Sequence, residues 1–220
     1  MFTQEKDMIP VIRTKLGVVF DTNYFIEEFR SGNGIVDLAF TTSSFNCHKP
    51  FDKFDFETVY FLTTFLNKKN KKLTFKILSS RSSLKKTKIK LILNCLLDFG
   101  YIEKKDDYYI VIETYKAALA DLISIEAKIK DWKKGFHQAM RYQYFSDMSY
   151  LAISDEYLHR VDIELLKNNN VGLIAVSKED ARFIYKPRRK NPKNRTSYNY
   201  LCEYFISLFQ TNGVRTLQVD

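Results

Sequence analysis

Short apolar runs separated by polar turns divide the C-terminal half of the chain into segments with two different periods. Runs typical of buried strands occupy residues 119–129, 148–154 and 172–177, and an edge strand is expected at residues 181–185. Segments with apolar residues at helical spacing occupy residues 131–145, 155–167 and 198–209. This alternation predicts an α/β fold in which helices flank a sheet that contains parallel strand pairs.

The N-terminal segment contains one predicted helix and one predicted strand. Apolar residues at helical spacing after a capping Asp-Thr pair predict a helix over residues 21–30, which carries Glu27 and Glu28. A Ser-Gly-Asn-Gly sequence then ends the helix, and residues 35–41 form a predicted buried strand. Asp37 is the one charged residue of that strand. Because a buried carboxylate is costly without a partner, Asp37 is a candidate functional residue.

The middle of the chain has a different pattern, three helices followed by a hairpin. The helices are expected at residues 54–65, 73–80 and 82–99, and the hairpin at residues 101–112. This order is typical of a winged helix-turn-helix. The third helix is basic in its first half and apolar in its second, as a recognition helix should be, and its bases are Lys85, Lys86, Lys88 and Lys90. We therefore predict a winged-helix domain over residues 51–112, inserted into a discontinuous α/β domain of residues 1–50 and 113–220.

Charge strengthens the prediction of nucleic-acid binding. The formal net charge is +9, which favours an anionic partner. Between residues 67 and 105 lysine and arginine greatly outnumber the two acids, and residues 186–195 contain no acid. Two basic blocks indicate two contact surfaces for DNA, with a duplex the expected partner. Beyond the third helix, the predicted DNA-binding residues are Lys104, Lys105, Arg188, Arg189 and Lys190.

Composition also narrows the class of protein. A chain of 220 residues with 45% apolar content can build one large core or two small ones. No apolar run is long enough to span a membrane and the first residues lack a signal-peptide core, so we expect no membrane partner and a cytoplasmic location. The three cysteines stand far apart without a CxxC pair, which argues against a zinc site or a disulfide framework. His137, His159 and the Cys47–His48 pair are therefore interpreted as structural.

Glu126 and Lys128 are the strongest catalytic candidates. On a strand, residues two apart face the same side, so these two side chains point together, and Asp37 joins them if its strand is the neighbour. Converging carboxylates without histidine or cysteine ligands suit a hard cation, Mg²⁺ or Mn²⁺. Such an ion activates a water for attack on a phosphodiester, and a lysine stabilises the developing charge.

At these residues the sequence resembles the PD-(D/E)xK nuclease superfamily, which has the restriction-endonuclease-like fold. The matches are Asp37 and the Glu126-Ala127-Lys128 triplet. The resemblance implies Mg²⁺-dependent phosphodiester hydrolysis around a mixed central sheet. It also implies a further acid on the preceding helix, Glu27 or Glu28, and a glutamine on the following helix, Gln138 rather than the more distant Gln143.

The chain departs from that family pattern in two respects. Val36 stands where a proline often precedes the first acid, and a long segment separates Asp37 from Glu126 where a direct hairpin is usual. The inserted winged helix accounts for the long segment. Since cleavage of both DNA strands normally needs two active sites, a homodimer or a larger DNA-processing complex is a plausible assembly.

Three alternatives remain, of which two reinterpret the same residues and the third uses different ones. The chain can be a catalytically silent DNA-binding regulator, or an interaction subunit of a DNA-processing assembly, in which Glu126 and Lys128 form an ordinary ion pair. In a third alternative, the sequence Val-Val-Phe-Asp-Thr-Asn at residues 18–23 resembles the start of PIN-domain ribonucleases. That resemblance implies a strand-end metal ligand at Asp21, a late acid at Asp180 and an RNA substrate.

Overall fold

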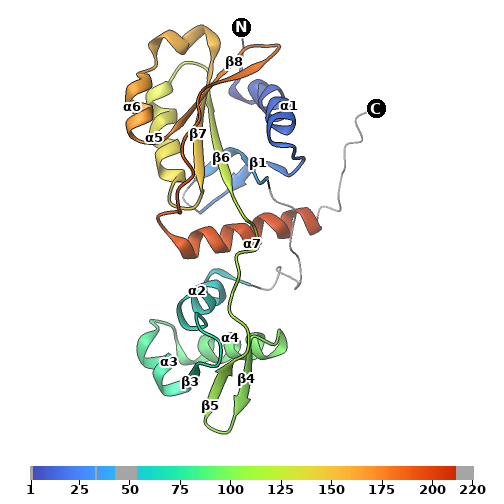
Figure 1. Ribbon diagram of the computed structural model, residues 1–220, viewed down its shortest axis with the longest axis vertical. Coiled ribbons are helices and arrows are strands. Elements are labelled where there is room, and N and C mark those ends of the chain that lie inside the picture. Colours follow the sequence, from blue (N-terminus) through green and yellow to red (C-terminus); the bar gives the residue numbers. More distant parts are fainter. Residues whose placement is uncertain (1, 33, 43–53, 212–220) are drawn as a thin grey trace. The chain divides into compact units, whose positions relative to one another are not determined.

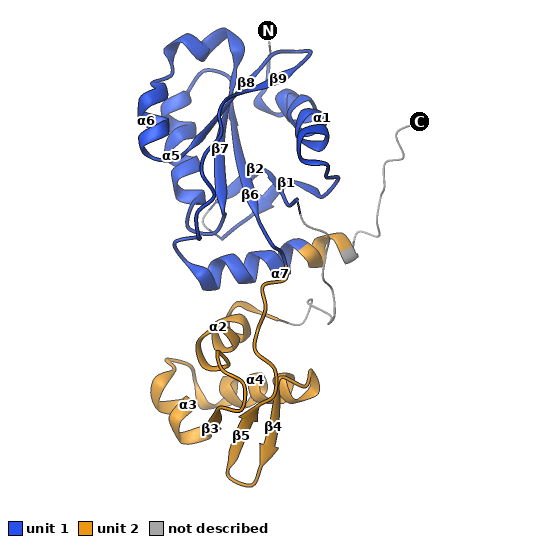
Figure 2. Ribbon diagram, viewed as in Figure 1, with its two compact units in different colours: residues 1–46, 119–205 blue, residues 47–118, 206–220 orange. Residues whose placement is uncertain are grey.

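The computed structural model describes residues 2–32, 34–42 and 54–211, which divide into two compact units (Figures 1 and 2). Unit 1 consists of Met1–Asn46 and Leu119–Phe205, and unit 2 consists of Cys47–Ala118 and Ile206–Asp220. The chain therefore leaves unit 1 after Asn46, returns to it at Leu119, and leaves it again after Phe205. The boundaries expected from sequence are residues 51 and 112 for the insertion, with the whole C-terminal segment in the larger domain.

Unit 1 is built around a six-stranded mixed sheet with the order β1-β2-β6-β7-β8-β9. β2 pairs antiparallel with both β1 and β6, whereas β6, β7 and β8 are parallel, and β9 pairs antiparallel with β8 at the edge. The strands are β1 (Phe25–Arg30), β2 (Ile35–Phe40), β6 (Ile123–Lys128), β7 (Met148–Ser154), β8 (Gly172–Val176) and β9 (Ala181–Tyr185). The mixed α/β class expected from sequence is confirmed.

Helices cover both faces of this sheet (Figure 1). One face packs against η1 (Glu5–Met8) and α1 (Ile9–Phe20), and the core there includes Ile12, Leu16, Ile125 and Tyr150. The other face packs against α5 (Trp132–Tyr142) and α6 (Ile163–Asn168). Because side chains alternate along β6, Ile123, Ile125 and Ala127 face α1, which leaves Glu126 and Lys128 on the α5 side.

The prediction of a helix over residues 21–30 is wrong. The helix is α1, which ends where Asp21 adopts a left-handed backbone with φ 48°, and Phe25–Arg30 is strand β1, so Glu27 and Glu28 lie on a strand. Two causes explain the error. The buried positions of α1, which are Ile9, Ile12 and Leu16, all precede residue 21, and β1 gains its backbone hydrogen bonds from pairing with β2.

Most other elements of unit 1 match their predicted positions. The strand predicted over residues 35–41 is β2, and the strands expected at residues 148–154 and 181–185 are β7 and β9. The prediction of a single helix over residues 155–167 is wrong. This segment forms two helices, η3 (Asp155–Arg160) and α6. The division occurs where the Asp162 side chain accepts the backbone N–H of Leu165 and starts a new helix. The terminal helix α7 (Arg195–Thr211) is longer than predicted.

The described residues 54–118 of unit 2 form three helices and a three-stranded antiparallel sheet of order β3-β5-β4. A short strand precedes the second helix, and the predicted hairpin forms β4 and β5. The third helix ends before Gly100, which has the left-handed φ of 69° that favours glycine. The elements are α2 (Phe56–Phe65), β3 (Lys72–Thr74), α3 (Phe75–Arg81), α4 (Lys86–Asp98), β4 (Ile102–Lys105) and β5 (Tyr108–Val111).

Among the described residues, no helix has both the length and the apolar composition needed to cross a lipid bilayer. Cys95 and Cys202 form no disulfide with a described residue, and burial raises the pKa of Cys202 well above its usual range. Cys47 and His48 lie outside the described residues.

Candidate functional site

The pairing of β2 with β6 brings Asp37 to the Glu126-Ala127-Lys128 triplet, although a long stretch of chain separates them in sequence. Leu38 pairs with Ile125, so the next positions along the two strands are Asp37 and Glu126. The Asp37 Oδ2 atom accepts the backbone N–H of Ala127 at 2.7 Å. Asp37 is therefore fixed beside the triplet by a hydrogen bond across the two strands.

The Lys128 ammonium lies among three carboxylates. Its Nζ atom is 2.6 Å from Glu126 Oε1, 3.2 Å from Glu5 Oε2 and 3.9 Å from Asp37 Oδ2. It also donates to the carbonyl oxygen of Ala127 at 2.8 Å. The Lys128 side chain is 7% exposed and that of Glu126 is 1% exposed, whereas Asp37 and Glu5 remain partly open to solvent. The cluster is thus buried at Glu126 and accessible at Asp37.

Helix α5 covers this cluster and completes the contacts of Glu126. The Tyr142 hydroxyl is 2.6 Å from Glu126 Oε2 and 2.9 Å from the carbonyl oxygen of Ile35. The two carboxylate oxygens of Glu126 are therefore held from two elements, Oε1 by Lys128 on β6 and Oε2 by Tyr142 on α5. At the start of the same helix, Gly135 leaves room for the Lys128 stem, because a Cβ atom at Gly135 would lie 2.8 Å from Lys128 Cγ.

Burial and neighbouring charges shift the pKa of each group in the cluster. Burial, together with the neighbouring carboxylates of Glu5 and Glu28, raises the pKa of Asp37 against the opposing effects of Ala127 and Lys128. Burial and the nearby Asp37 raise the pKa of Glu126, although Lys128 and Tyr142 oppose this. Burial acts to lower the pKa of Lys128, but the Glu126 hydrogen bond and the surrounding acids outweigh it and raise that pKa.

The two candidate acids before Asp37 occupy different surroundings. Glu27 pairs with Leu38 in the β1–β2 ladder, and its Oε1 atom lies 3.6 Å from Arg13 Nη1. Glu28 falls opposite Asp37 in the same register and has a left-handed backbone with φ 51°. Since the Glu28 carboxylate contributes to the raised pKa of Asp37, Glu28 is the nearer acid. Neither residue comes from a helix, so that part of the expectation is corrected.

Gln138 and Gln143 also differ. The Oε1 atom of Gln138 is buried and has no hydrogen-bond partner among the described residues. In contrast, the Gln143 Nε2 atom donates to the carbonyl oxygens of Asn169 and Asn170 at 2.8 and 3.4 Å. Gln143 therefore ties the end of α5 to the turn before β8, whereas the Gln138 amide has spare hydrogen-bonding capacity next to the cluster.

The predicted basic residues of unit 2 are of two kinds. Lys85, Lys86 and Lys90 are exposed at the N-terminal half of α4, and Lys104 is exposed on β4. Lys88, however, forms an ion pair with Asp55, the residue that caps α2, and its Nζ atom lies 4.0 Å from Glu57 Oε2. The Nζ atom of Lys105 is 2.6 Å from Glu103 Oε1. Lys88 and Lys105 are therefore engaged by acids of their own unit.

The basic segment before α7 is partly structural as well. The Arg189 Nε atom lies 3.4 Å from Asp147 Oδ1, and its guanidinium also donates to the carbonyl oxygen of Ala120. The backbone of Arg188 accepts from and donates to the side chain of Asn170 at 2.8 and 2.9 Å. Lys190 donates its backbone N–H to Asp147 but has an exposed side chain. Arg189 thus holds this segment to unit 1 through Asp147.

The residues of the PIN-type alternative are placed differently from the expectation. The Val-Val-Phe sequence before Asp21 ends helix α1 instead of forming a strand, so Asp21 is not at a strand end. Asp180 pairs with Lys15, whose Nζ atom is 2.9 Å away. The local structure that this alternative requires at Asp21 is absent.

Several residues of the site region were not predicted from the sequence. They are Glu5, Tyr142 and the cations near Gln138, which are Lys134, Arg141 and Lys193. Glu5 comes from the N-terminal turn and reaches Lys128 only through tertiary packing. Tyr142 could be predicted from the sequence, because it lies four residues after Gln138 and so faces the same side of a helix. The cations line a surface depression beside α5.

Comparisons with known proteins leave the function open. No model of a known protein family matches this chain, and no curated protein matches it. Among solved structures, the chain is similar to the SPO1766 protein of unknown function from Silicibacter pomeroyi, at 12% identity and a TM-score of 0.46. That similarity covers 96% of this chain and 90% of the other.

Proposed function

We propose that this chain is a metal-dependent nuclease that hydrolyses phosphodiester bonds in DNA. The observation that carries the proposal is the convergence of Asp37, Glu126 and Lys128 through the β2–β6 pairing. An acid on one strand beside a Glu-x-Lys triplet on its neighbour, in a mixed sheet with helices on both faces, supports the restriction-endonuclease-like assignment. The resemblance to the PD-(D/E)xK superfamily therefore has a spatial counterpart in unit 1.

The residues of the cluster fit a hard divalent cation. Among the described residues, no three His, Cys, Asp or Glu side chains form a ready metal-binding group. Mg²⁺ nevertheless needs only one or two carboxylates when water and substrate phosphate complete its coordination. Asp37 and Glu126 supply such oxygen ligands, and their raised pKa values mark a place where positive charge is favoured. Glu28 is the further acid best placed to assist.

Each side chain then has a separate chemical task. Mg²⁺ or Mn²⁺, when bound, polarises the phosphodiester and makes a water more acidic. Tyr142 holds one oxygen of Glu126, which keeps the other oxygen directed into the site. Lys128, which pairs with Glu126 in this structure, provides the positive charge that stabilises the attacking hydroxide or the phosphorane oxygens.

Unit 2 supports DNA as the substrate. Its order of helix, strand, helix, helix and two-stranded hairpin is that of a winged helix, and we propose that it positions the duplex. Lys85, Lys86 and Lys90 present their exposed bases on the helix that would enter the groove. Phosphate contacts from these lysines would contribute affinity that depends on salt.

Nicking of supercoiled plasmid tests this function. Wild-type protein should convert the plasmid to the open form with Mg²⁺ or Mn²⁺ and not with EDTA. The Glu126→Gln and Lys128→Ala variants should lose this activity, since each removes a charge from the cluster. Glu164→Gln is the matched control, because Glu164 is an exposed acid on α6 that pairs with Lys167. Equal nicking by Glu126→Gln and the wild type would refute the assignment.

A second candidate function, a DNA-binding regulator without catalysis, is favoured by one observation. The Lys128 ammonium lies near both Glu126 and Asp37, where it already offsets one of their two negative charges. If that arrangement persists in the presence of divalent ions, the cluster is a structural ion pair. The regulator then binds DNA in a salt-sensitive manner and shows no nicking with either metal.

A further inference from the structure

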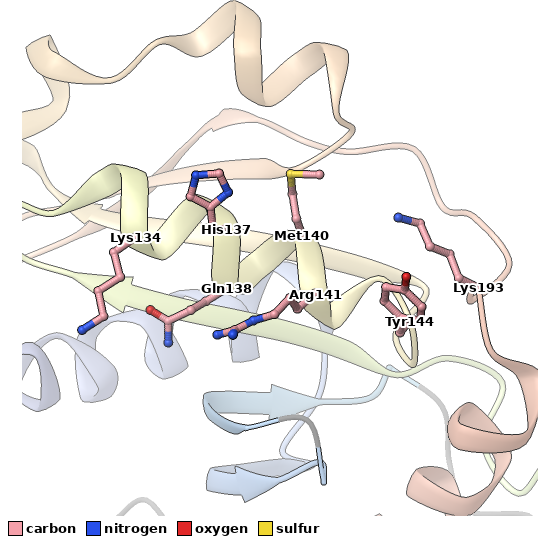
Figure 3. Close-up of a pocket in the computed structure, with 7 residues that line it drawn as sticks. All are labelled: Lys134, His137, Gln138, Met140, Arg141, Tyr144 and Lys193. Carbon is pink, nitrogen blue, oxygen red and sulfur yellow. The ribbon is translucent and has the colours of Figure 1, made fainter.

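Helix α5 has a basic side next to the carboxylate cluster. Lys134, Gln138 and Arg141 extend to the same side of the helix in Figure 3, as their spacing of four and three residues requires. With Tyr144 and Lys193 they line an open depression of about 660 Å³. Among the described residues, none that line it is acidic. The depression therefore attracts anions.

Backbone hydrogen bonds hold the far wall of this depression. The N–H of Lys193 donates to the carbonyl oxygen of Gln143 at 3.1 Å, and the N–H of Asn194 donates to that of Tyr144 at 2.8 Å. The Lys193 Nζ atom lies 5.3 Å from the centroid of the Tyr144 ring. Lys193, which comes from a segment far along the chain, is thus fixed at the C-terminal end of α5 (Figure 3).

Gln138, one of the residues that line the depression, has a polar atom that lacks a partner among the described residues. Gln138 Oε1 is buried without a hydrogen bond to any described residue. Buried polar atoms are nearly always paired, so such an atom calls for an explanation. A side-chain amide can present either its oxygen or its NH₂ group after rotation, and it is therefore able to bind a phosphate oxygen or a hydroxyl. A bound ligand would satisfy it.

The depression borders the face of α5 that covers the carboxylate cluster. Tyr142, the partner of Glu126, directly follows Arg141, and Gly135, which lies against the Lys128 stem, directly follows Lys134. The basic side chains therefore flank the helical face that covers the cluster.

We propose that this depression binds the sugar-phosphate backbone of one nucleic-acid strand beside the bond to be cleaved. The inference deepens the proposed nuclease function and depends on it for the identity of the reacting bond. The volume lies within the roughly 300–1,000 Å³ usual for sites that take a small molecule, so it suits a nucleotide-sized segment better than a duplex. Lys134, Arg141 and Lys193 bind phosphates, and the half-exposed Tyr144 ring offers a surface for a base.

Fluorescence anisotropy with a short labelled single-stranded DNA in EDTA tests the proposal without requiring cleavage. The variant combines Lys134→Gln, Arg141→Gln and Lys193→Gln. The control combines Lys133→Gln, Lys167→Gln and Lys178→Gln, which removes the same charge from exposed positions of unit 1 outside the depression. We expect the variant to bind about tenfold more weakly than the control. The slope of log Kd against log salt should fall by about 2, since each lost contact to a single strand contributes about 0.7.

The remaining arms separate the possible results. A larger loss with the single strand than with a duplex of the same sequence supports strand binding, and an RNA arm shows whether the sugar matters. Equal Kd values for variant and control, an equal loss with the duplex, or no binding by the wild type would overturn the proposal. Because metal is absent, strand binding that survives when plasmid nicking fails removes only the nuclease assignment.

Discussion

Tyr142 shows how one hydroxyl connects the fold to the proposed chemistry. It belongs to α5, yet its hydroxyl contacts Glu126 on β6 and the carbonyl oxygen of Ile35 on β2. Residues of this kind set the orientation of a metal ligand without binding the metal themselves. Tyr142 acts by orienting the Glu126 carboxylate and not by proton transfer. Burial, and after it the hydrogen bond to Glu126, raises the pKa of the Tyr142 phenol well above its usual range.

Replacement of Tyr142 by Phe should weaken the response to metal. The hydrogen bond lowers the pKa of Glu126, so its loss raises that pKa and lets protons compete better with the metal. We expect the nicking rate to fall about 10- to 100-fold at limiting Mn²⁺ and to recover at saturating Mn²⁺. The loss should be greater at lower pH.

The control for this variant is Tyr150→Phe, which removes a hydroxyl from a tyrosine that belongs to the core beside α1. Tyr150 packs against Phe183 at a centroid distance of 5.8 Å and has no contact with Glu126 in the described structure. If the two variants require the same Mn²⁺ concentration, Tyr142 does not position Glu126.

Helix α5 is the element that organises the site. Its N-terminal turn is fixed by the Asp131 side chain, which accepts the N–H of Lys134 at 3.2 Å. Its first apolar turn must lie close to the sheet, and Gly135 makes this possible. A Cβ atom there would lie 2.6 Å from Leu151 Cδ1 and 2.8 Å from Lys128 Cγ, both too short for unstrained contact.

Gly135→Ala should therefore destabilise unit 1 although alanine favours helices. The propensity gain is about 1 kcal/mol, whereas overpacking in a core costs about 1–3 kcal/mol and here also displaces the Lys128 stem. A lower urea midpoint with a reduced nicking rate is the expected result. Lys133→Ala, at an exposed position of the same helix, should leave both nearly unchanged. A Gly135→Ala variant as stable and active as the wild type would show that the helix can move away from the sheet.

The elements also show what a single sequence can and cannot predict. Asp37 and Glu126 were correctly expected on neighbouring strands, because each is an acid in an apolar run and burial demands a partner. The helix over residues 21–30 was wrongly expected, because short apolar segments are ambiguous until pairing is known and β1 is paired by β2. Glu5 and Lys193 reach the site only through the packing of η1 and the return of the chain after β9. No local sequence pattern predicts such contacts.

At the scale of the whole molecule, charge is distributed between two units that each hold exposed bases. Those of α4 are candidates for duplex contacts, and those of the depression are candidates for one strand. This division predicts that the two sets affect binding to different forms of DNA.

Neutralisation of Lys85, Lys86 and Lys90 to Gln should reduce duplex affinity and lower the salt slope by about 2.7, since each phosphate contact to B-DNA contributes about 0.9. Lys88→Gln serves as a contrast within the same helix. Lys88 is paired with Asp55, so its loss should lower the stability of unit 2. The expected decrease is under about 1 kcal/mol, because the pair is partly exposed, and the salt slope should change little. Duplex titrations over a range of salt concentrations, with urea unfolding alongside, measure both effects. An unchanged slope in the triple variant would exclude α4 as the contact surface.

The central claim is that Asp37 and Glu126 together hold a divalent ion that drives phosphodiester cleavage. Plasmid nicking measured against Mn²⁺ concentration tests it most directly, with Asp37→Asn beside the wild type and Glu164→Gln as the exposed-acid control. We predict nicking by the wild type and the control at the same Mn²⁺ concentrations. Asp37→Asn should need far more Mn²⁺ or show no nicking. Identical Mn²⁺ dependence for Asp37→Asn and the wild type, or no nicking by the wild type at any Mn²⁺ concentration, would contradict the claim.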